Sequence, residues 1–257
     1  MLYQIIQYLK FLKRSTNQHG VHSPFVYNLV TKCFYDKKGY QDYALLSSYK
    51  KALLYTKSTL QITDLGTGSV YTKSNTRPIN TIAKNAGASL KHTKLLYRLT
   101  RYFQFNNSLE LGTSLGVSTH AIALGNKKGK IISIEGCPNI AQFTSQNLKN
   151  NHVTNAEVLI GDFSEVIPKL NNNTLDFVLF DGNHNKTATL AYFELLLPKT
   201  HNDTVFIFDD IYWSQGMTEA WEIIKNHAKV KVTIDTFQYG FVFFRQEQVK
   251  EHFTIRL

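Results

Sequence analysis

The sequence has few cysteines and no long hydrophobic run, and both shortages exclude classes of protein. Its two cysteines, Cys33 and Cys137, are far apart, and neither belongs to a CxxC pair. This spacing predicts neither a zinc site nor a disulfide framework, and it favours a reducing, cytoplasmic environment. The first residues, MLYQIIQYLKFLKRST, are interrupted by polar side chains and lack a small-residue cleavage site. We therefore expect neither a signal peptide nor a membrane span.

Acidic residues are missing from one long stretch. No Asp or Glu occurs in residues 65–109, and the whole chain carries a formal net charge of +10. This charge favours an anionic partner, such as nucleic acid, a phosphorylated metabolite or a lipid surface. A solvated basic helical face is the alternative interpretation. The basic residues of the stretch are Lys73, Arg77, Lys84, Lys91, Lys94, Arg98 and Arg101.

Residues 1–95 are expected to form a helical and irregular extension that precedes a catalytic domain over residues 96–257. The clearest helix signal is HSPFVYNLVTKC, where Ser23 can cap a helix and Pro24 suits its first position. His19 and His22 have no acidic or cysteine neighbour with which to bind a metal, so we expect a structural role for them. The extension is a candidate lid, substrate surface or dimer surface.

From about residue 106, apolar runs alternate with helix-length segments. The five runs are residues 108–112, 130–135, 156–161, 175–181 and 204–210. This alternation predicts an α/β fold with a doubly wound, mainly parallel, Rossmann-like sheet. Two further β-rich runs, VKVTIDTF and FVFFRQ, are joined by residues 238–240, which predicts an antiparallel hairpin at the end of the chain.

Two glycine-containing loops, ITDLGTGS at residues 62–69 and LELGTSLGVST at residues 109–119, are candidates for a nucleotide-type loop. Such a loop needs a strand before it, a helix after it and an acid about 20 positions further on for the ribose hydroxyls. The first loop has no acid after it until Glu110 and continues into polar residues. The second is followed by the helical pattern VSTHAIALG and by Glu135. We therefore expect the cofactor at the second loop.

Glu110, within this loop segment, indicates which cofactor binds there. A carboxylate at the strand end would repel a dinucleotide pyrophosphate but attract the sulfonium and amino groups of S-adenosylmethionine. The sequence also contains no HExxH and no GxxxxGK motif, so zinc-protease and P-loop kinase activities have no support.

These motifs resemble those of class I S-adenosylmethionine-dependent methyltransferases. Residues 110–116, the acid of IEG, the GDF after the third strand and the FDGNH after the fourth follow the family's order and spacing. The resemblance covers about residues 95–250. With HGVHSPF and FIFDDIYWS included, the chain resembles more closely a group of bacterial methyltransferases common in Bacteroidetes, for which no acceptor is known.

The resemblance implies a set of cofactor-binding residues. Glu135, with Gly136 beside it, would accept hydrogen bonds from both ribose hydroxyls, because a carboxylate accepts from two donors at once. Asp162 would face the adenine amino group and Phe163 would pack on the ring, although Asp162 also suits a helix cap. Asp181 ends the fourth strand, where ligands bind in open parallel sheets. The residues expected near the methionine part are Glu110, Gly112, Thr113, Ser114 and Gly116.

FDGNH and FDD also resemble the catechol-type O-methyltransferases, in which acids after the fourth and fifth strands hold a divalent metal. Asp181, Asp209 and Asp210 match those positions, and their oxygens would suit Mg²⁺. The third ligand in that family is usually an asparagine, whereas this chain has Asp210. The family's basic lysine, three residues after the first acid, is here His184, whose ordinary pKa suits a general base.

Two aromatic residues follow the paired acids. Tyr212 and Trp213 could stack on a planar acceptor or pack beneath the loop.

Three functions follow from these patterns. The favoured function is O-methylation of a small-molecule acceptor, with or without metal, by an enzyme expected to be a cytoplasmic homodimer. The second is methylation of RNA or another polyanion through the basic stretch at residues 73–101. The third is a non-catalytic module that binds the cofactor without turnover.

Overall fold

The computed structural model describes residues 2–63, 75–85, 88–171 and 174–257, which form two compact units. One unit contains the N-terminal residues up to 35 together with residues 170–257, and the other contains residues 36–169. Neither unit has a boundary near residue 95, where the sequence suggests the end of an extension. Most of the candidate loop at residues 62–69 lies outside the described residues.

The unit of residues 36–169 contains a parallel sheet and the helices that pack on it. Strands β3 (Asn107–Leu111), β4 (Lys130–Glu135) and β5 (Ala156–Ile160) are parallel, with β4 between the other two. A separate two-stranded sheet pairs β1 (Thr59–Gln61) with β2 (Thr76–Pro78) antiparallel. The helices are α3 (Asp42–Tyr55), α4 (Ile79–Asn85), α5 (Leu90–Phe103), α6 (Val117–Gly125), α7 (Pro138–Asn150) and α8 (Phe163–Val166), followed by the 3₁₀ turn Ile167–Lys169.

Local sequence accounts for where several of these elements begin. The Ser89 side chain accepts the His92 N–H and caps α5, while Pro138 occupies the first turn of α7, where no N–H is needed. Helix α6 is buried almost all round and packs against α5. Burial on nearly every side explains why VSTHAIALG contains no charged residue and has no exposed polar face.

The other unit contains the remaining strands, in the order β10-β8-β9-β7-β6. β6 (Phe177–Phe180) and β7 (Val205–Asp209) are parallel, and β9 (Tyr239–Phe243) runs antiparallel to both β7 and β8 (Val232–Asp235). β10 (Glu251–Thr254) lies parallel to β8 at the edge. The helices are α1 (Leu2–Arg14), α2 (Pro24–Leu29), the π-helical turn Val30–Phe34, α9 (Lys186–Leu196) and α10 (Gln215–Asn226), with 3₁₀ turns at Gln18–Gly20 and Leu197–Lys199.

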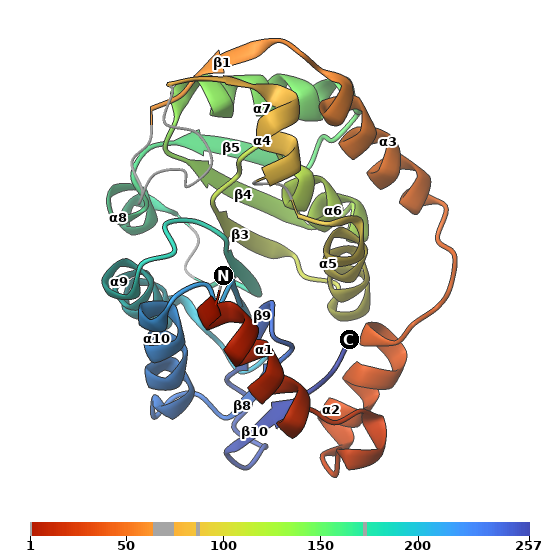
Figure 1. Ribbon diagram of the computed structural model, residues 1–257, viewed down its shortest axis with the longest axis vertical. Helices are drawn as coiled ribbons and strands as arrows, with labels where there is room; N and C mark the ends of the chain where they lie inside the picture. The colour runs from red at the N-terminus through yellow and green to blue at the C-terminus, as the bar shows by residue number, and fades with distance from the viewer. Residues whose placement is uncertain (1, 64–74, 86–87, 172–173) are drawn as a thin grey trace. The chain divides into compact units, whose positions relative to one another are not determined.

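The N-terminal residues of this unit pack on its last strands and loops. Thr16 forms a parallel bridge with Ile255, and Tyr8 and Phe11 of α1 contact Phe237, between β8 and β9. Helices α9 and α10, the teal and blue helices of Figure 1, pack against each other. Among the described residues, no helix is both long and apolar enough to cross a lipid bilayer.

The architecture is the one expected from the sequence: a Rossmann-like α/β fold with mostly parallel strands, flanking helices and a terminal β8–β9 hairpin. All five apolar runs are strands, and the run at residues 130–135 coincides with β4. The Ser23 side chain accepts the Val26 N–H at the start of α2, which confirms the predicted cap. Strand β10 was not expected.

Candidate active site

The loop after β3 has a backbone that depends on glycine. Gly112, Ser114 and Gly116 have φ values of 103°, 46° and 75°. A Cβ on Gly116 would lie 2.6 Å from Thr144 Cγ2 and 2.9 Å from Tyr49 Oη, so a side chain has neither the conformation nor the space it needs. Close approach of the backbone to its surroundings is what a cofactor-binding loop requires.

Hydrogen bonds fix this loop from several sides. The Gly112 N–H donates to the Ile134 carbonyl at the end of β4. The Thr144 hydroxyl on α7 donates to the Ser114 carbonyl at 2.7 Å, and the Tyr49 hydroxyl on α3 donates to the Leu115 carbonyl at 2.8 Å. The loop is therefore held in one conformation by three neighbouring elements.

The carboxylate of Glu135, at the end of β4, reaches the same loop. Its Oε2 accepts the Ser114 N–H at 2.8 Å and its Oε1 accepts the Cys137 N–H at 2.9 Å. A carboxylate can accept about four hydrogen bonds, so the group is chemically suited to bind a diol. The acid predicted to bind ribose therefore lies beside Ser114, as its spacing from the glycine loop requires. Gly136, next to it, is half-buried.

Glu110 lies beneath the loop, with none of its surface exposed. Its Oε2 accepts hydrogen bonds from the Thr119 hydroxyl at 2.5 Å and the Ser133 hydroxyl at 2.6 Å. Its Oε1 has no hydrogen-bond partner among the described residues. Burial raises the pKa of this carboxyl to about 7. A buried acid with an unpartnered oxygen agrees with a nearby cationic ligand, such as the amino and sulfonium groups of S-adenosylmethionine.

Asp162 caps a helix. Its Oδ1 accepts the N–H and the hydroxyl of Ser164, so it starts α8. If Asp162 also contacts the adenine, as predicted, it must do so with the carboxylate that caps α8. Phe163, the next residue, is half-buried. Thr113 is buried, with its hydroxyl 2.6 Å from that of Ser133.

His184 and Asp181 lie together in the segment between β6 and α9. His184 Nε2 is 4.0 Å from Asp181 Oδ1, and the two side chains are 25% and 20% exposed. The Asn185 side chain caps α9 directly after them. At this distance the two side chains do not form a hydrogen bond, but the carboxylate is close enough to stabilise a protonated imidazole, as a general base requires.

Asp209 and Asp210 share one hydrogen-bond donor. Gln238 Nε2 donates to Asp209 Oδ1 at 2.8 Å and to Asp210 Oδ1 at 2.5 Å. Burial, with a further contribution from Asp209, raises the pKa of Asp210 to about 6. The side chains of the described residues include no group of three or more that could hold a metal. The predicted Mg²⁺ site at Asp181, Asp209 and Asp210 is therefore not supported, and the Gln238 amide instead binds one oxygen of Asp209 and one of Asp210.

The two aromatic residues after Asp210 differ in exposure. Tyr212 is only 3% exposed and packs against the Phe237 ring, so its position agrees with packing beneath the loop and not with stacking on an acceptor. Trp213 is 37% exposed, and its ring centroid lies 6.5 Å from that of His184. Trp213 is thus the aromatic surface available beside the histidine.

Residues 112–116 also match the GxSxG pattern of serine hydrolases, on a strand-to-helix turn of the kind that those enzymes use. A hydrolytic serine needs a histidine within hydrogen-bond distance of its hydroxyl. Ser114 has no such histidine partner in the part of the chain that the structure describes. The turn is therefore better explained as a ligand-binding loop.

Part of the basic stretch is occupied by aromatic partners from the same chain. Lys94 Nζ lies 4.8 Å from the Tyr43 ring centroid, and the Arg101 guanidinium carbon lies 5.0 Å from that of Tyr40. Arg98 donates to the Tyr43 hydroxyl at 3.2 Å. These cation–π and hydrogen-bond contacts give the three cations a structural role, which does not favour polyanion binding. Lys73 lies outside the described residues.

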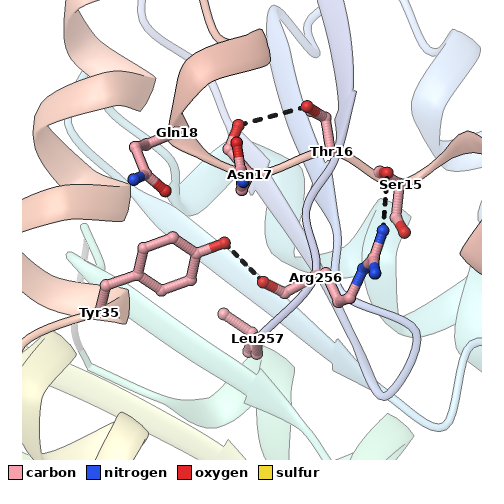
Figure 2. Close-up of a pocket in the computed structure, with 7 residues that line it drawn as sticks. All are labelled: Ser15, Thr16, Asn17, Gln18, Tyr35, Arg256 and Leu257. Carbon is pink, nitrogen blue, oxygen red and sulfur yellow. Dashed lines mark hydrogen bonds between the residues drawn. The ribbon is translucent and has the colours of Figure 1, made fainter.

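Figure 2 shows a polar pocket whose lining contains none of the predicted site residues. Its volume is about 490 Å³. The Tyr35 hydroxyl donates to the Arg256 carbonyl at 2.6 Å, and Arg256 donates to the Ser15 carbonyl at 3.4 Å. The pocket is lined by Ser15, Thr16, Asn17, Gln18, Tyr35, Arg256 and Leu257.

Sequence reasoning did not identify several residues that shape these regions. Tyr49 contacts the cofactor loop from α3, some 60 positions earlier in the chain, and Gln238 bridges the two acids from the hairpin turn. Neither residue belongs to a recognisable sequence motif, because each contacts residues that are distant in sequence. Only Gln238, at the tip of the predicted hairpin that follows β7, could have been suspected.

Part of the chain is similar in sequence to a known family. Residues 109–211 match a family described as a methyltransferase domain. No curated protein matches the chain in sequence.

Three solved structures share the fold. A methyltransferase from Podospora anserina, PaMTH1, bound to S-adenosylhomocysteine, has a TM-score of 0.63 and 12% identity, covering 88% of this chain and 97% of its own. The O-methyltransferase TomG from Streptomyces achromogenes, in complex with S-adenosylmethionine, has a TM-score of 0.57 and 18% identity, covering 81% and 91%. An O-methyltransferase from Bacillus cereus has a TM-score of 0.53 and 24% identity, covering 61% and 81%.

Residues 109–211 thus resemble a methyltransferase domain, and the chain shares its fold with structures that hold S-adenosylmethionine or S-adenosylhomocysteine. The segment begins in β3, immediately before the glycine loop, and ends after Asp210. The narrower resemblance to a Bacteroidetes group stays a prediction.

Proposed function

We propose that the chain transfers the methyl group of S-adenosylmethionine to a hydroxyl group of a small, planar acceptor. The observation that carries this proposal is the pairing of His184 with Asp181, 4.0 Å apart and partly exposed, directly after β6. Parallel α/β sheets bind ligands beyond the carboxyl ends of their strands, and that is where both residues lie. The O-methyltransferases among the structural neighbours support the same acceptor class.

The cofactor would be held by the residues around the β3 loop. The backbone at Gly112 and Gly116 allows close approach, and Glu135 would accept hydrogen bonds from the ribose hydroxyls. Glu110, beneath the loop, would stabilise the positively charged amino and sulfonium groups of the ligand through its negative charge. Asp162 and Phe163 would contact the adenine. The bound S-adenosylmethionine would supply an electrophilic methyl group.

In the proposed transfer, a hydroxyl oxygen of the acceptor would form a bond to the methyl carbon as the carbon–sulfur bond breaks. The acceptor proton would pass to His184, and the nearby Asp181 carboxylate would stabilise the imidazolium that forms. The leaving thioether is neutral. The protein therefore needs only to align the acceptor and remove one proton, and Trp213 offers a flat surface for that alignment. Asp209 and Asp210 would contribute a negative edge that favours the imidazolium formed at His184.

The test compares His184→Gln with a matched histidine variant, using release of S-adenosylhomocysteine from a panel of phenols, catechols and aliphatic alcohols. We expect kcat for a methylated phenol to fall by roughly 10²- to 10⁴-fold in His184→Gln, with little change in cofactor affinity. The control is His201→Gln. His201 also pairs with an aspartate, 2.8 Å from Asp176, but lies before β7, at the opposite end of the parallel strands.

Two results would contradict the proposal. One is full activity of His184→Gln toward the preferred hydroxyl acceptor. The other is a purified chain that methylates RNA or a protein but no small hydroxyl compound. Addition of a chelator tests the metal-assisted form separately, and we expect no loss of rate because the three acids do not form a ligand group.

A further inference from the structure

Helix α1 exposes hydrophobic side chains to an unusual extent. Of the sixteen large hydrophobic side chains exposed among the described residues, five belong to residues 2–9 of this one helix. Leu2, Ile5, Ile6 and Leu9 are 43–73% exposed and recur at the spacing of one helical face. We call these four residues the α1 stripe.

The other side of α1, which packs on the protein, combines polar contacts with the aromatic contacts of Tyr8 and Phe11 to Phe237. The Tyr3 hydroxyl donates to Thr218 at 2.8 Å, Gln4 donates to the Trp213 carbonyl at 3.4 Å, and Arg14 forms an ion pair with Asp235 at 2.7 Å. Phe11 is the buried apolar residue of the helix. A surface helix normally turns its apolar face inward. Here four apolar side chains face outward as well, and packing on the protein's own core does not account for this α1 stripe.

The charge around the α1 stripe is of one sign. Lys10 and Lys13 lie next to it and are exposed, and neither has an ion pair within the described residues. No Asp or Glu precedes Asp36 in the sequence. A second copy of the helix would bring these cations together without acids to pair with them. A surface of anionic headgroups over hydrocarbon would accommodate both the cations and the stripe.

We propose that α1 lies in the plane of a lipid bilayer containing anionic lipids, with the α1 stripe in the interfacial layer and Lys10 and Lys13 among the headgroups. With 13 residues the helix is about 20 Å long, which suits a position along the surface and is too short to cross it. Because Gln4 contacts the backbone of Trp213, the bound helix would bring the loop after β7 close to the membrane surface.

The test measures co-sedimentation of the full-length protein with vesicles of pure phosphatidylcholine and with vesicles of equal parts phosphatidylcholine and phosphatidylglycerol. We expect binding to the anionic vesicles to be roughly tenfold tighter and to weaken with salt. The double variant Ile6→Gln/Leu9→Gln should lose most of this binding. Lys10→Gln/Lys13→Gln should lose the preference for anionic vesicles.

Matched controls distinguish binding through the α1 stripe from non-specific hydrophobic or electrostatic binding to vesicles. Leu195→Gln/Ile223→Gln removes two exposed apolar side chains from α9 and α10 of the same unit, and Lys128→Gln/Lys149→Gln removes two exposed lysines elsewhere. Both should bind anionic vesicles like the wild type. Equal binding to both vesicle types, or unchanged binding of Ile6→Gln/Leu9→Gln, would overturn the proposal. So would light scattering that shows a dimer lost in this variant together with no vesicle binding, because a second copy would then cover the stripe.

Discussion

At the scale of single residues, the motif that contains Glu110 predicted the position of this carboxylate but not its hydrogen-bond partners or its burial. The sequence indicated that a carboxylate belongs at the strand end. It could not indicate that the hydroxyls of Ser133 and Thr119 would bind one oxygen, or that the other would be fully buried with no partner among the residues that the structure describes. Those partners come from β4 and α6, so their contacts depend on how the chain folds.

The buried position of Glu110 predicts a pH-dependent stability. Its pKa of about 7 lies above the ordinary value of 4.5, so the folded protein holds this proton more tightly than the unfolded chain. The contribution is therefore full below about pH 4.5 and is lost as the pH rises towards 7, by on the order of 3 kcal/mol in the free energy of unfolding. Glu110→Gln should remove this dependence, as measured by urea unfolding between pH 4 and 8.

The control for this measurement is Glu157→Gln, an exposed glutamate on β5, which should retain the wild-type pH profile. A Glu110→Gln variant whose stability falls with pH as steeply as that of the wild type would show that Glu110 does not carry the effect.

At the scale of elements, α1 is tied to the loop after β7 and to the end of β8 by a charged hydrogen-bond cluster. Arg14 donates to Tyr212 and Asp235, and the Tyr212 hydroxyl donates to Asp235 Oδ2 at 2.5 Å. Burial and Asp235 raise the pKa of Tyr212, so the hydroxyl stays protonated and acts as a donor. The cluster fixes the segment that presents Trp213.

Tyr212→Phe tests this cluster. Removing a buried hydroxyl that donates to a carboxylate should lower the free energy of unfolding by about 1–2 kcal/mol, measured by denaturant unfolding at pH 7. Tyr35→Phe removes an exposed hydroxyl bonded to a carbonyl and should cost clearly less. Equal losses of unfolding free energy in the two variants would mean that the cluster stabilises the fold no more than one exposed hydrogen bond does.

The strands were predictable, whereas the grouping of the acids was not. An apolar run such as KIISIE predicts a buried strand from its composition alone, and β4 coincides with that run. β10, EHFT, is short and polar and gains its order from pairing with β8, so it leaves no such pattern. The metal site expected at Asp181, Asp209 and Asp210 depended on side-chain directions, and Gln238 binds Asp209 and Asp210 from the hairpin turn through contacts that no local pattern predicts.

At the scale of the whole molecule, the order of the chain does not correspond to its compact units. Residues 1–35 join residues 170–257, through contacts such as the Thr16 N–H to the Thr254 carbonyl. These partners are more than 200 positions apart, so no local pattern could predict them. The residues expected to bind the cofactor, Asp181 apart, all belong to the unit of residues 36–169.

The central claim is that the loop after β3, with Glu135, binds S-adenosylmethionine. Calorimetric titration of the purified chain with S-adenosylmethionine and S-adenosylhomocysteine tests it most directly. We predict saturable binding of both, weakened at least tenfold in Glu135→Ala, a loss of about 1.4 kcal/mol, and unchanged in Glu157→Ala. No binding heat with either compound, or equal affinity of Glu135→Ala and wild type, would contradict the account.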